Sequence, residues 1–320
     1  MSKKIKNKQN KSKKGLGIFI NPRSDFGFKR VFNNMRQMIS FLNNVIFKDI
    51  SGYDVETLIF LPTEHFGETN IEHMIIADIR CKIQTLEDIL VEMQNALSKN
   101  FAERLLFYST YLIRNQAPKR RTKEQDKKQE KPWHYDLKAV YIIAIVNFPM
   151  IKPKGQVISW AKLMDKNTNK VFSDKLNFII VDLTKFNKKE DGLETPEDFW
   201  LYTLKYAEAL SECPEKIKQD ETFNELYDIL RTNKLTQEEM EAYNNSVLTM
   251  DNLSFFTDYA RDEGEKKGEK RGEKRGEEKK LIQIIFDAFD RGRSIEVIAD
   301  IVNLTVDQVH TILQNRKDGK

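Results

Sequence analysis

The spacing of hydrophobic residues changes from helical to strand-like along the first part of the chain. Apolar side chains recur every three to four residues at 24–47, which predicts a helix with Ser24 or Asp25 as its N-cap. The run at 139–148 is uninterrupted, as in a strand that is buried on both faces. The other elements expected here are strands at 54–61, 72–83, 88–94 and 176–183 and a helix at about 97–116.

The pattern becomes helical in a region at 186–260, and a segment of unusual composition follows it. Residues 261–280 contain only charged residues and glycine, with a glycine at every fourth position. Glutamate and lysine favour a helix, but each glycine costs about 1 kcal/mol relative to alanine, and no apolar face exists to be buried. We therefore expect a semi-flexible spacer. The three helices before it are expected near 196–211, 215–231 and 235–260.

Residues 281–320 form a small apolar unit after the spacer. Ser294 can cap one short helix, and Thr305 with Gln308 can form a capping box for a second one. Together with the four-residue turn around Asn303, these helices resemble a helix-turn-helix. The second helix presents few basic residues, so the alternative of a helical hairpin that mediates homo-oligomer formation stays open.

Charge is distributed unevenly along the chain, although the net charge is only +4. Residues 1–14 carry +7 and residues 119–131 carry +4, which leaves −7 for the rest. Two basic segments on an acidic body suit a polyanionic partner such as DNA. The alternative is a pair of solvated, disordered stretches that keep the chain soluble. We expect residues 1–19 to be a basic disordered arm.

The remaining composition excludes several classes of protein. Cys81 and Cys213 are too few for a disulfide framework and lack the paired spacing of a zinc site. No run approaches 18 consecutive apolar residues, so we expect no membrane span. The basic N-terminus lacks the apolar core of a secretory signal, which favours a cytoplasmic protein. No glycine-rich loop of the Walker type occurs, so use of nucleoside triphosphates is not expected.

Two of the expected strands carry polar residues on one face. Alternate residues of a strand point to opposite sides, so Asp78, Arg80 and Lys82 share a face. Glu92 and Gln94 share the corresponding face of the next strand. If the strands form a hairpin, apolar faces match only when the numbers of paired residues have an even sum. Pairing Asp78 with Glu92 satisfies this condition and leaves a short loop at 84–86, with the Cβ atoms on the order of 5 Å apart.

Two carboxylates at that separation repel each other unless a cation or a proton lies between them. Magnesium prefers such oxygens and keeps its waters for substrate phosphates, which predicts a metal-dependent phosphodiester site. Gln94 could hold the water or the phosphate. The alternative is a solvent-facing hairpin in which Asp78 pairs with Arg80 or Lys82. Ile76 and Leu90 on the same face indicate that a helix covers at least part of it.

The order of these elements and their motifs resembles the PD-(D/E)XK nuclease superfamily. More narrowly, the chain is similar to its recombination-promoting nuclease and putative transposase family. The resemblance implies an α/β fold with a restriction-endonuclease-like core, a mixed sheet flanked by helices, at 20–185, and a helical C-terminal region. The motifs are "DFGFKRVF" at 25–32, "FLNNVI" at 41–46, "ADIRC" at 77–81, "VEMQ" at 91–94, "FAERLLFYSTYL" at 101–112, "VYIIAIVNF" at 140–148 and "SIEVIADIVNLT" at 294–305.

The resemblance implies that Asp78 and Glu92 bind Mg²⁺ or Mn²⁺ and, with Gln94, are the catalytic residues. The wider superfamily has lysine where this chain has Gln94, whereas the narrower family commonly has glutamine. Glutamine brings no charge and no titrating proton, so it can neither act as a general base nor stabilise charge as lysine does. Arg80 or Lys82 could supply the missing charge.

Further residues are candidates for contacts with DNA or with the metal. Asp25 either caps the first helix or approaches the metal, and Lys29 could reach a phosphate. Arg104 and Tyr108 share a helix face and either bind the DNA backbone or brace Glu92. The charged insertion at 119–131 is longer than in relatives and is also expected to contact DNA.

These observations lead to one preferred function and one alternative. We expect a magnesium-dependent DNA endonuclease, a hydrolase of phosphodiester bonds that is recombination-promoting or transposase-like. The alternative is a catalytically inert DNA-binding or interaction protein that retains the nuclease fold.

Overall fold

The computed structural model describes residues 17–63, 78–98, 100–117, 134–150 and 156–317. The insertion predicted at 119–131 and the basic residues 1–14 lie outside these ranges. The chain divides into two compact units, Met1–Ser254 and Phe255–Lys320. The first unit holds the sheet and the second is helical.

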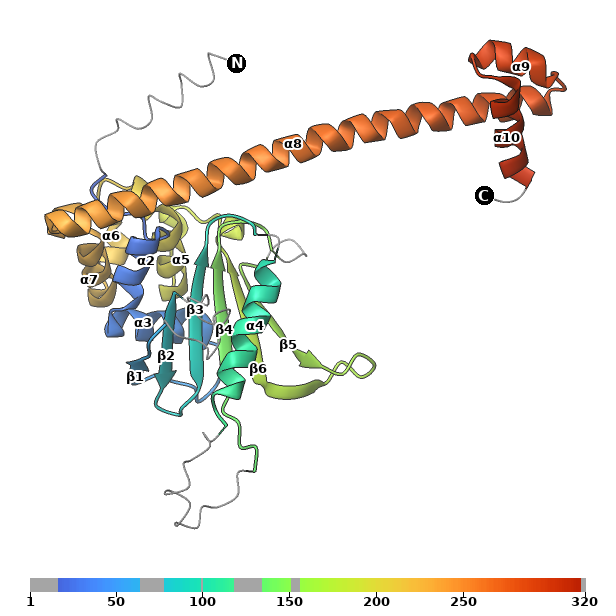
Figure 1. Cartoon of the computed structure of the whole chain (residues 1–320). Helices are drawn as coiled ribbons and strands as arrows, with labels where there is room; N and C mark the ends of the chain where they lie inside the picture. The colour runs from blue at the N-terminus through green and yellow to red at the C-terminus, as the bar shows by residue number, and fades with distance from the viewer. Residues whose placement is uncertain (1–16, 64–77, 99, 118–133, 151–155, 318–320) are drawn as a thin grey trace, which may run out of the picture. The chain divides into compact units, whose positions relative to one another are not determined.

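A six-stranded mixed sheet forms the centre of the first unit (Figure 1). Its strand order is β1-β2-β3-β4-β6-β5, with β3, β4 and β6 parallel to one another and the other pairs antiparallel. Strand β4 is buried along its whole length, as its continuous apolar run predicts. The strands are β1 (Leu58–Phe60), β2 (Ile79–Ile83), β3 (Asp88–Gln94), β4 (Val140–Val146), β5 (Ile158–Met164) and β6 (Val171–Asp182).

Helices cover both faces of this sheet (Figure 1). Helix α4 (Phe101–Arg114) packs on the face formed by even-numbered strand residues such as Leu90 and Ile142. The odd-numbered face packs on the other helices around a core centred on Trp200. This arrangement confirms the predicted α/β fold with a mixed sheet and flanking helices. The helices of the second face are α2 (Asp25–Phe32), α3 (Met35–Phe41), the π-helical turn η2 (Leu42–Ile46), α5 (Pro196–Tyr206), α6 (Glu215–Lys218) and α7 (Glu221–Leu230).

The single helix predicted at 24–47 is wrong, because the chain breaks into three helical pieces there. Asn34 adopts an extended conformation as the N-cap of α3, and its side chain accepts the N–H of Gln37 at 3.1 Å. An asparagine that caps a new helix competes with continuation of the old one. The spacing of the apolar residues continues unchanged across this break, so the spacing alone does not reveal where the helix ends.

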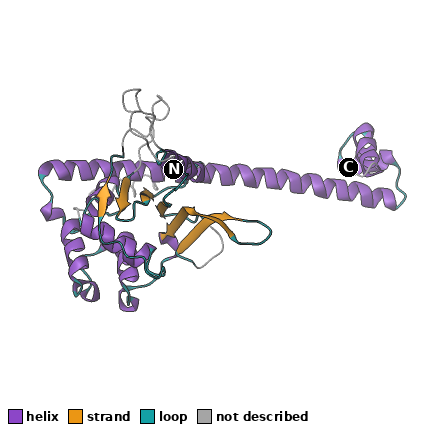
Figure 2. Ribbon diagram, turned by 90° about the horizontal axis from the view of Figure 1, so that it is seen from below, coloured by secondary structure: helices purple, strands orange, loops and turns teal. Residues whose placement is uncertain are grey.

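Strand β5 has no counterpart among the predicted strands. It lies at the edge of the sheet, and its residues from Ala161 to Met164 are exposed. The β5–β6 hairpin projects beyond the remaining strands (Figure 2). An edge strand with little buried surface leaves only a weak hydrophobic signal in the sequence.

The disordered arm predicted at residues 1–19 ends too late in the sequence. Ile20 N–H donates to the carbonyl of Leu230 at 2.8 Å, and the ring of Phe19 packs edge-on against Tyr227 at 5.2 Å. Phe19 is fully buried. Residues 17–19 therefore belong to the folded unit, because one aromatic side chain attaches them to α7.

Helix α8 (Gln237–Asp290) continues from the first unit into the second. The residues predicted as a semi-flexible spacer, 261–280, are helical throughout. The residues between the glycines are strong helix formers, and oppositely charged neighbours such as Lys266 and Glu269 are three positions apart. These local preferences outweigh four glycines without any buried face.

In the second unit, α9 (Ile295–Val302) and α10 (Val306–Lys317) pack with the end of α8 around Ile285. The capping box is present: Thr305 N–H donates to Gln308 Oε1 at 2.9 Å, and Gln308 N–H donates to Thr305 Oγ1 at 3.3 Å. Asn303 has a left-handed backbone conformation (φ 53°) in the turn. Of all helices in the described part of the chain, none has an apolar stretch long enough to cross a membrane.

Candidate active site

The β2–β3 hairpin places Asp78 opposite Glu92. The ladder pairs Ile79 with Val91 and Arg80 with Leu90, which is the register predicted from the alternation of side chains. Asp78 precedes the first residue of β2, and Glu92 belongs to β3. Both side chains lie on the even-numbered face of the sheet, on the side covered by α4. Residues 72–77, which were predicted to begin the strand, lie outside the described ranges.

Backbone hydrogen bonds hold the two carboxylates in place. Asp78 N–H donates to Glu92 Oε1 at 3.3 Å, and Met93 N–H donates to Asp78 Oδ2 at 2.8 Å. Burial raises the pKa of Asp78. Burial, reinforced by the charge of Asp78, raises the pKa of Glu92 to about 8. The site therefore resists carrying two negative charges without a cation.

This electrostatic conflict predicts an unusual pH dependence of stability in the metal-free protein. The pKa of Glu92 is higher in the folded chain than in the unfolded chain, so stability falls as pH rises from about 4.5 to about 8. Glu92→Gln removes this loss. In EDTA we expect the variant to unfold roughly 5 °C above the wild type at pH 8.5 and close to it at pH 5.

Thermal unfolding at a series of pH values measures this difference. Glu103→Gln is the matched control, because Glu103 is an exposed residue of α4. Parallel curves for wild type and Glu92→Gln across the whole pH range would contradict the assignment of a strained carboxylate pair.

Arg104 of α4 is the cation that contacts this pair. Its Nη2 lies 2.7 Å from Gln94 Oε1 and 3.6 Å from Glu92 Oε2. The Gln94 amide donates from Nε2 to the carbonyl of Ala96 at 2.9 Å, which fixes its orientation. The guanidinium also lies over the ring of Phe101 at 5.0 Å. These contacts agree with the bracing of Glu92 that was predicted for Arg104, and they do not test its predicted contact with DNA.

Arg80 and Lys82 lie on the same face but contact a different carboxylate. Asp88, which is fully buried, accepts from Arg80 Nη2 at 2.9 Å and lies 3.4 Å from Lys82 Nζ. The alternative in which Asp78 pairs with Arg80 or Lys82 does not hold in this geometry. Arg104, and not Arg80 or Lys82, brings positive charge to Glu92. The sequence alone gives Asp88 no role, although its place opposite Lys82 on the polar face follows from the same register.

Helix α2 brings two more of the predicted residues to the site. Ser24 is its N-cap, since Ser24 Oγ accepts the N–H of Gly27 at 3.1 Å, so Asp25 is not the cap. Asp25 and Lys29 form an ion pair at 2.8 Å. After burial and a backbone hydrogen bond, their charges are the next causes that act on the pKa of Asp78, which Asp25 raises and Lys29 lowers. The charges of both residues therefore act on Asp78.

A second connection joins α2 to the end of β3. Asn95 Nδ2 donates to the carbonyl of Arg23 at 2.6 Å, and the Arg23 guanidinium lies 3.7 Å from Glu208. The sequence does not single out Arg23 or Asn95. The only indication that they belong to the site is that they flank the motifs at 25–32 and 91–94. Tyr108 is 5% exposed and packs in the core beneath α4, which favours a bracing role over contact with the DNA backbone.

The donor set suits a hard divalent cation. No group of three or more histidine, cysteine, aspartate or glutamate side chains that could hold a metal ion occurs among the described residues. The protein offers two adjacent carboxylates, and magnesium is typically bound by one or two carboxylates while water and phosphate complete its shell. Burial raises the pKa of both groups, and a bound cation would favour their ionised forms. Asp78 and Glu92 therefore fit Mg²⁺ or Mn²⁺.

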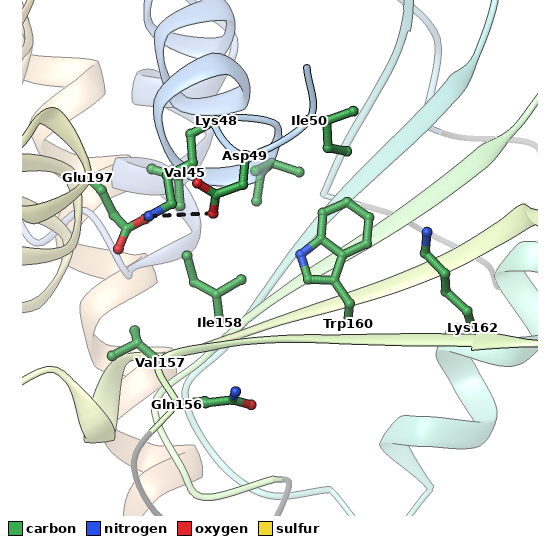
Figure 3. Close-up of a pocket in the computed structure, with 11 residues that line it drawn as sticks. Val45, Lys48, Asp49, Ile50, Gln156, Val157, Ile158, Trp160, Lys162 and Glu197 are labelled. Carbon is green, nitrogen blue, oxygen red and sulfur yellow. Dashed lines mark ion pairs between the residues drawn. The ribbon is translucent and has the colours of Figure 1, made fainter. Parts of the chain in front are cut away.

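A well-formed cavity elsewhere in this unit has none of the predicted site residues in its lining (Figure 3). Its volume is about 530 Å³, and it lies between the end of η2 and β5. Trp160 and Ile158 contribute apolar surface to it. Lys48 pairs there with Glu197 at 2.5 Å and with Asp49 at 3.8 Å (Figure 3). The charges of its lining residues neutralise one another.

Comparison with known proteins identifies the family. No curated protein and no solved structure matches the chain significantly. A family model described as PD-(D/E)XK nuclease family transposase matches residues 22–257, which include α2, the β2–β3 hairpin and α4. This match covers most of the chain and confirms the resemblance that the motifs indicate. The chain belongs to the PD-(D/E)XK nuclease family transposases.

Proposed function

We propose that this protein is a metal-dependent DNA endonuclease of the recombination-promoting, transposase-like kind. The observation that carries the proposal is the adjacent pair of carboxylates, half-buried Asp78 and buried Glu92, bonded to backbone N–H groups of the same hairpin. Membership of a nuclease family supports a phosphodiester substrate. Homo-oligomer formation through the C-terminal helices stays a prediction.

Asp78 and Glu92 would hold one Mg²⁺ or Mn²⁺ ion. When bound, such an ion lowers the pKa of a water and offsets the charge of a phosphoryl oxygen. The carboxylates must be ionised to act as ligands, and the pKa of Glu92 is about 8 in the metal-free protein. Metal binding is therefore expected to release a proton and to strengthen as pH rises.

The reaction is hydrolysis of a phosphodiester. The water oxygen forms a bond to phosphorus, the bond from phosphorus to the leaving sugar oxygen breaks, and that oxygen takes up a proton. Gln94 has no titrating proton, so its part is to orient its neighbours by hydrogen bonds. Lys29 lies near the carboxylates and is a candidate for contact with a neighbouring phosphate. The basic segments 1–14 and 119–131 are expected to give salt-dependent, sequence-tolerant binding.

The alternative is an inert DNA-binding protein with the same fold. It rests on Gln94, which brings no charge where the wider superfamily has lysine. Incubation of supercoiled plasmid with metal-free protein plus Mg²⁺, Mn²⁺ or Ca²⁺ distinguishes the two functions. We expect nicking with Mg²⁺ or Mn²⁺ and none in EDTA. Binding of the plasmid without cleavage in every ion would favour the inert alternative.

A further inference from the structure

Positive charge reaches the carboxylate pair from a helix and not from the strand that carries Gln94. Arg104 is ten positions after Gln94, and α4 brings its Nη2 to 2.7 Å from Gln94 Oε1. The same nitrogen lies 3.6 Å from Glu92 Oε2. The other end of the Gln94 amide is fixed by Ala96. The arginine head is thus held at the end of β3 by an oriented amide.

The Arg104 head group is only partly satisfied by the protein. Within the described part of the chain, its Nε is buried and has no hydrogen-bond partner. An unpaired buried donor costs about 1–3 kcal/mol, and an anionic oxygen is the acceptor that a guanidinium prefers. The side chain as a whole is 37% exposed, so a ligand can approach the guanidinium from its exposed side, although the buried Nε is not itself open to solvent. Phe101, 5.0 Å beneath the guanidinium, supports the group without accepting a hydrogen bond.

We propose that Arg104 is a catalytic residue that contacts the scissile phosphodiester and stabilises the charge that develops on it during hydrolysis, with Gln94 as its positioning residue. This inference rests on the proposed nuclease function. Arginine stays protonated throughout, so Arg104 transfers no proton and acts only through its charge and hydrogen bonds. Gln94 then orients Arg104, and its presence in place of the lysine of the wider superfamily does not mean that the site is inactive.

A purely structural role makes a different prediction. If Arg104 only neutralised Glu92, its removal would tighten metal binding and leave turnover unchanged once the metal is saturating. If Arg104 contacts the phosphodiester, its removal also tightens metal binding, by about threefold or more because a repulsive charge is lost, but turnover falls. Turnover at saturating metal therefore separates the two roles, and the metal affinity shows only that the charge beside Glu92 has been removed.

The test compares Arg104→Gln with the wild type and with Arg114→Gln. Arg114 is a matched control, because it ends the same helix and lies over the ring of Tyr111 at 5.7 Å, outside the contacts of the carboxylate pair. Cleavage of plasmid is measured at saturating Mg²⁺, Mg²⁺ affinity by thermal shift, and DNA affinity in Ca²⁺. Loss of one oriented donor typically lowers turnover by about 100- to 1,000-fold.

We expect that loss for Arg104→Gln, tighter Mg²⁺ binding and DNA affinity within about threefold of the wild type. Arg114→Gln should match the wild type. Adding Gln94→Lys to Arg104→Gln should raise turnover at least about tenfold above that of Arg104→Gln alone, because it restores a charge beside Glu92.

Unchanged turnover of Arg104→Gln overturns the inference while the nuclease function stands. If Arg104→Gln does not fold, Arg104→Lys replaces it, with a loss of about tenfold expected and no loss overturning the inference. A wild type that never cleaves overturns both proposals.

Discussion

Replacement of Glu92 by glutamine, or of Asp78 by asparagine, is expected to lower magnesium-dependent DNA cleavage by roughly 1,000-fold or more. Each change removes one ligand charge with little change of volume. Stabilisation by a bound ion is worth several kcal/mol in the transition state, and each 1.4 kcal/mol corresponds to a factor of ten in rate. The measurement is the initial rate of plasmid nicking at saturating DNA.

The loss of cleavage is meaningful only if the variants are folded, so their stability is measured as a control. Burial raises the pKa of both carboxylates, so the variants are expected to be at least as stable as the wild type in EDTA. Glu103→Gln, an exposed change on α4, should cleave at the wild-type rate. Cleavage by Glu92→Gln within about tenfold of the wild type would exclude Glu92 as a metal ligand.

Gly27→Ala is expected to have the largest effect on stability. A Cβ at Gly27 would lie 2.1 Å from the carbonyl oxygen of Asn21. Asn21 cannot move away easily, because it is fully buried, its N–H donates to Tyr243 Oη at 3.0 Å, and its amide donates to Glu208 at 2.7 Å. This contact explains the glycine in "DFGFK".

The overlap is expected to cost about 3 kcal/mol, which lowers the melting temperature by roughly 6–12 °C. Helix propensity alone predicts the opposite sign, since alanine is favoured over glycine by about 1 kcal/mol inside a helix. Urea unfolding of Gly27→Ala measures the difference. Gly192→Ala is the control, because no atom lies within 4 Å of its new Cβ. Equal stability of both variants would show that the Asn21 loop can yield.

The sequence predicts those features of the fold and the site that depend on residues close together in the chain. Strand alternation alone places Asp78 opposite Glu92, and the ladder has that register. The uninterrupted run of β4 predicts a central strand, and Thr305 with Gln308 predicts the start of α10. In each case the residues that decide the outcome are neighbours in the chain or in one hairpin.

The parts that could not be predicted depend on contacts between distant segments, on the choice among several charged partners, or on a cap that leaves the apolar period unchanged. The position of α4 on the sheet decides that Arg104 reaches Glu92 and Gln94, and spacing along the sequence does not give it. Asp88, which is buried, takes the charges of Arg80 and Lys82 within the β2–β3 hairpin, and strand alternation alone does not distinguish it from Asp78 as their partner. The division of the first predicted helix depends on Asn34, whose side chain caps α3 without changing the apolar period.

The claim on which the rest depends is that Asp78 and Glu92 together hold one divalent cation. Calorimetric titration of Mn²⁺ into metal-free protein at pH 8 tests it most directly, with Asp78→Asn measured alongside. We expect one Mn²⁺ ion per chain for the wild type and binding at least about 100-fold weaker for the variant, since half of the protein ligand set is gone. Equal binding by both proteins, or no binding by the wild type, would contradict it.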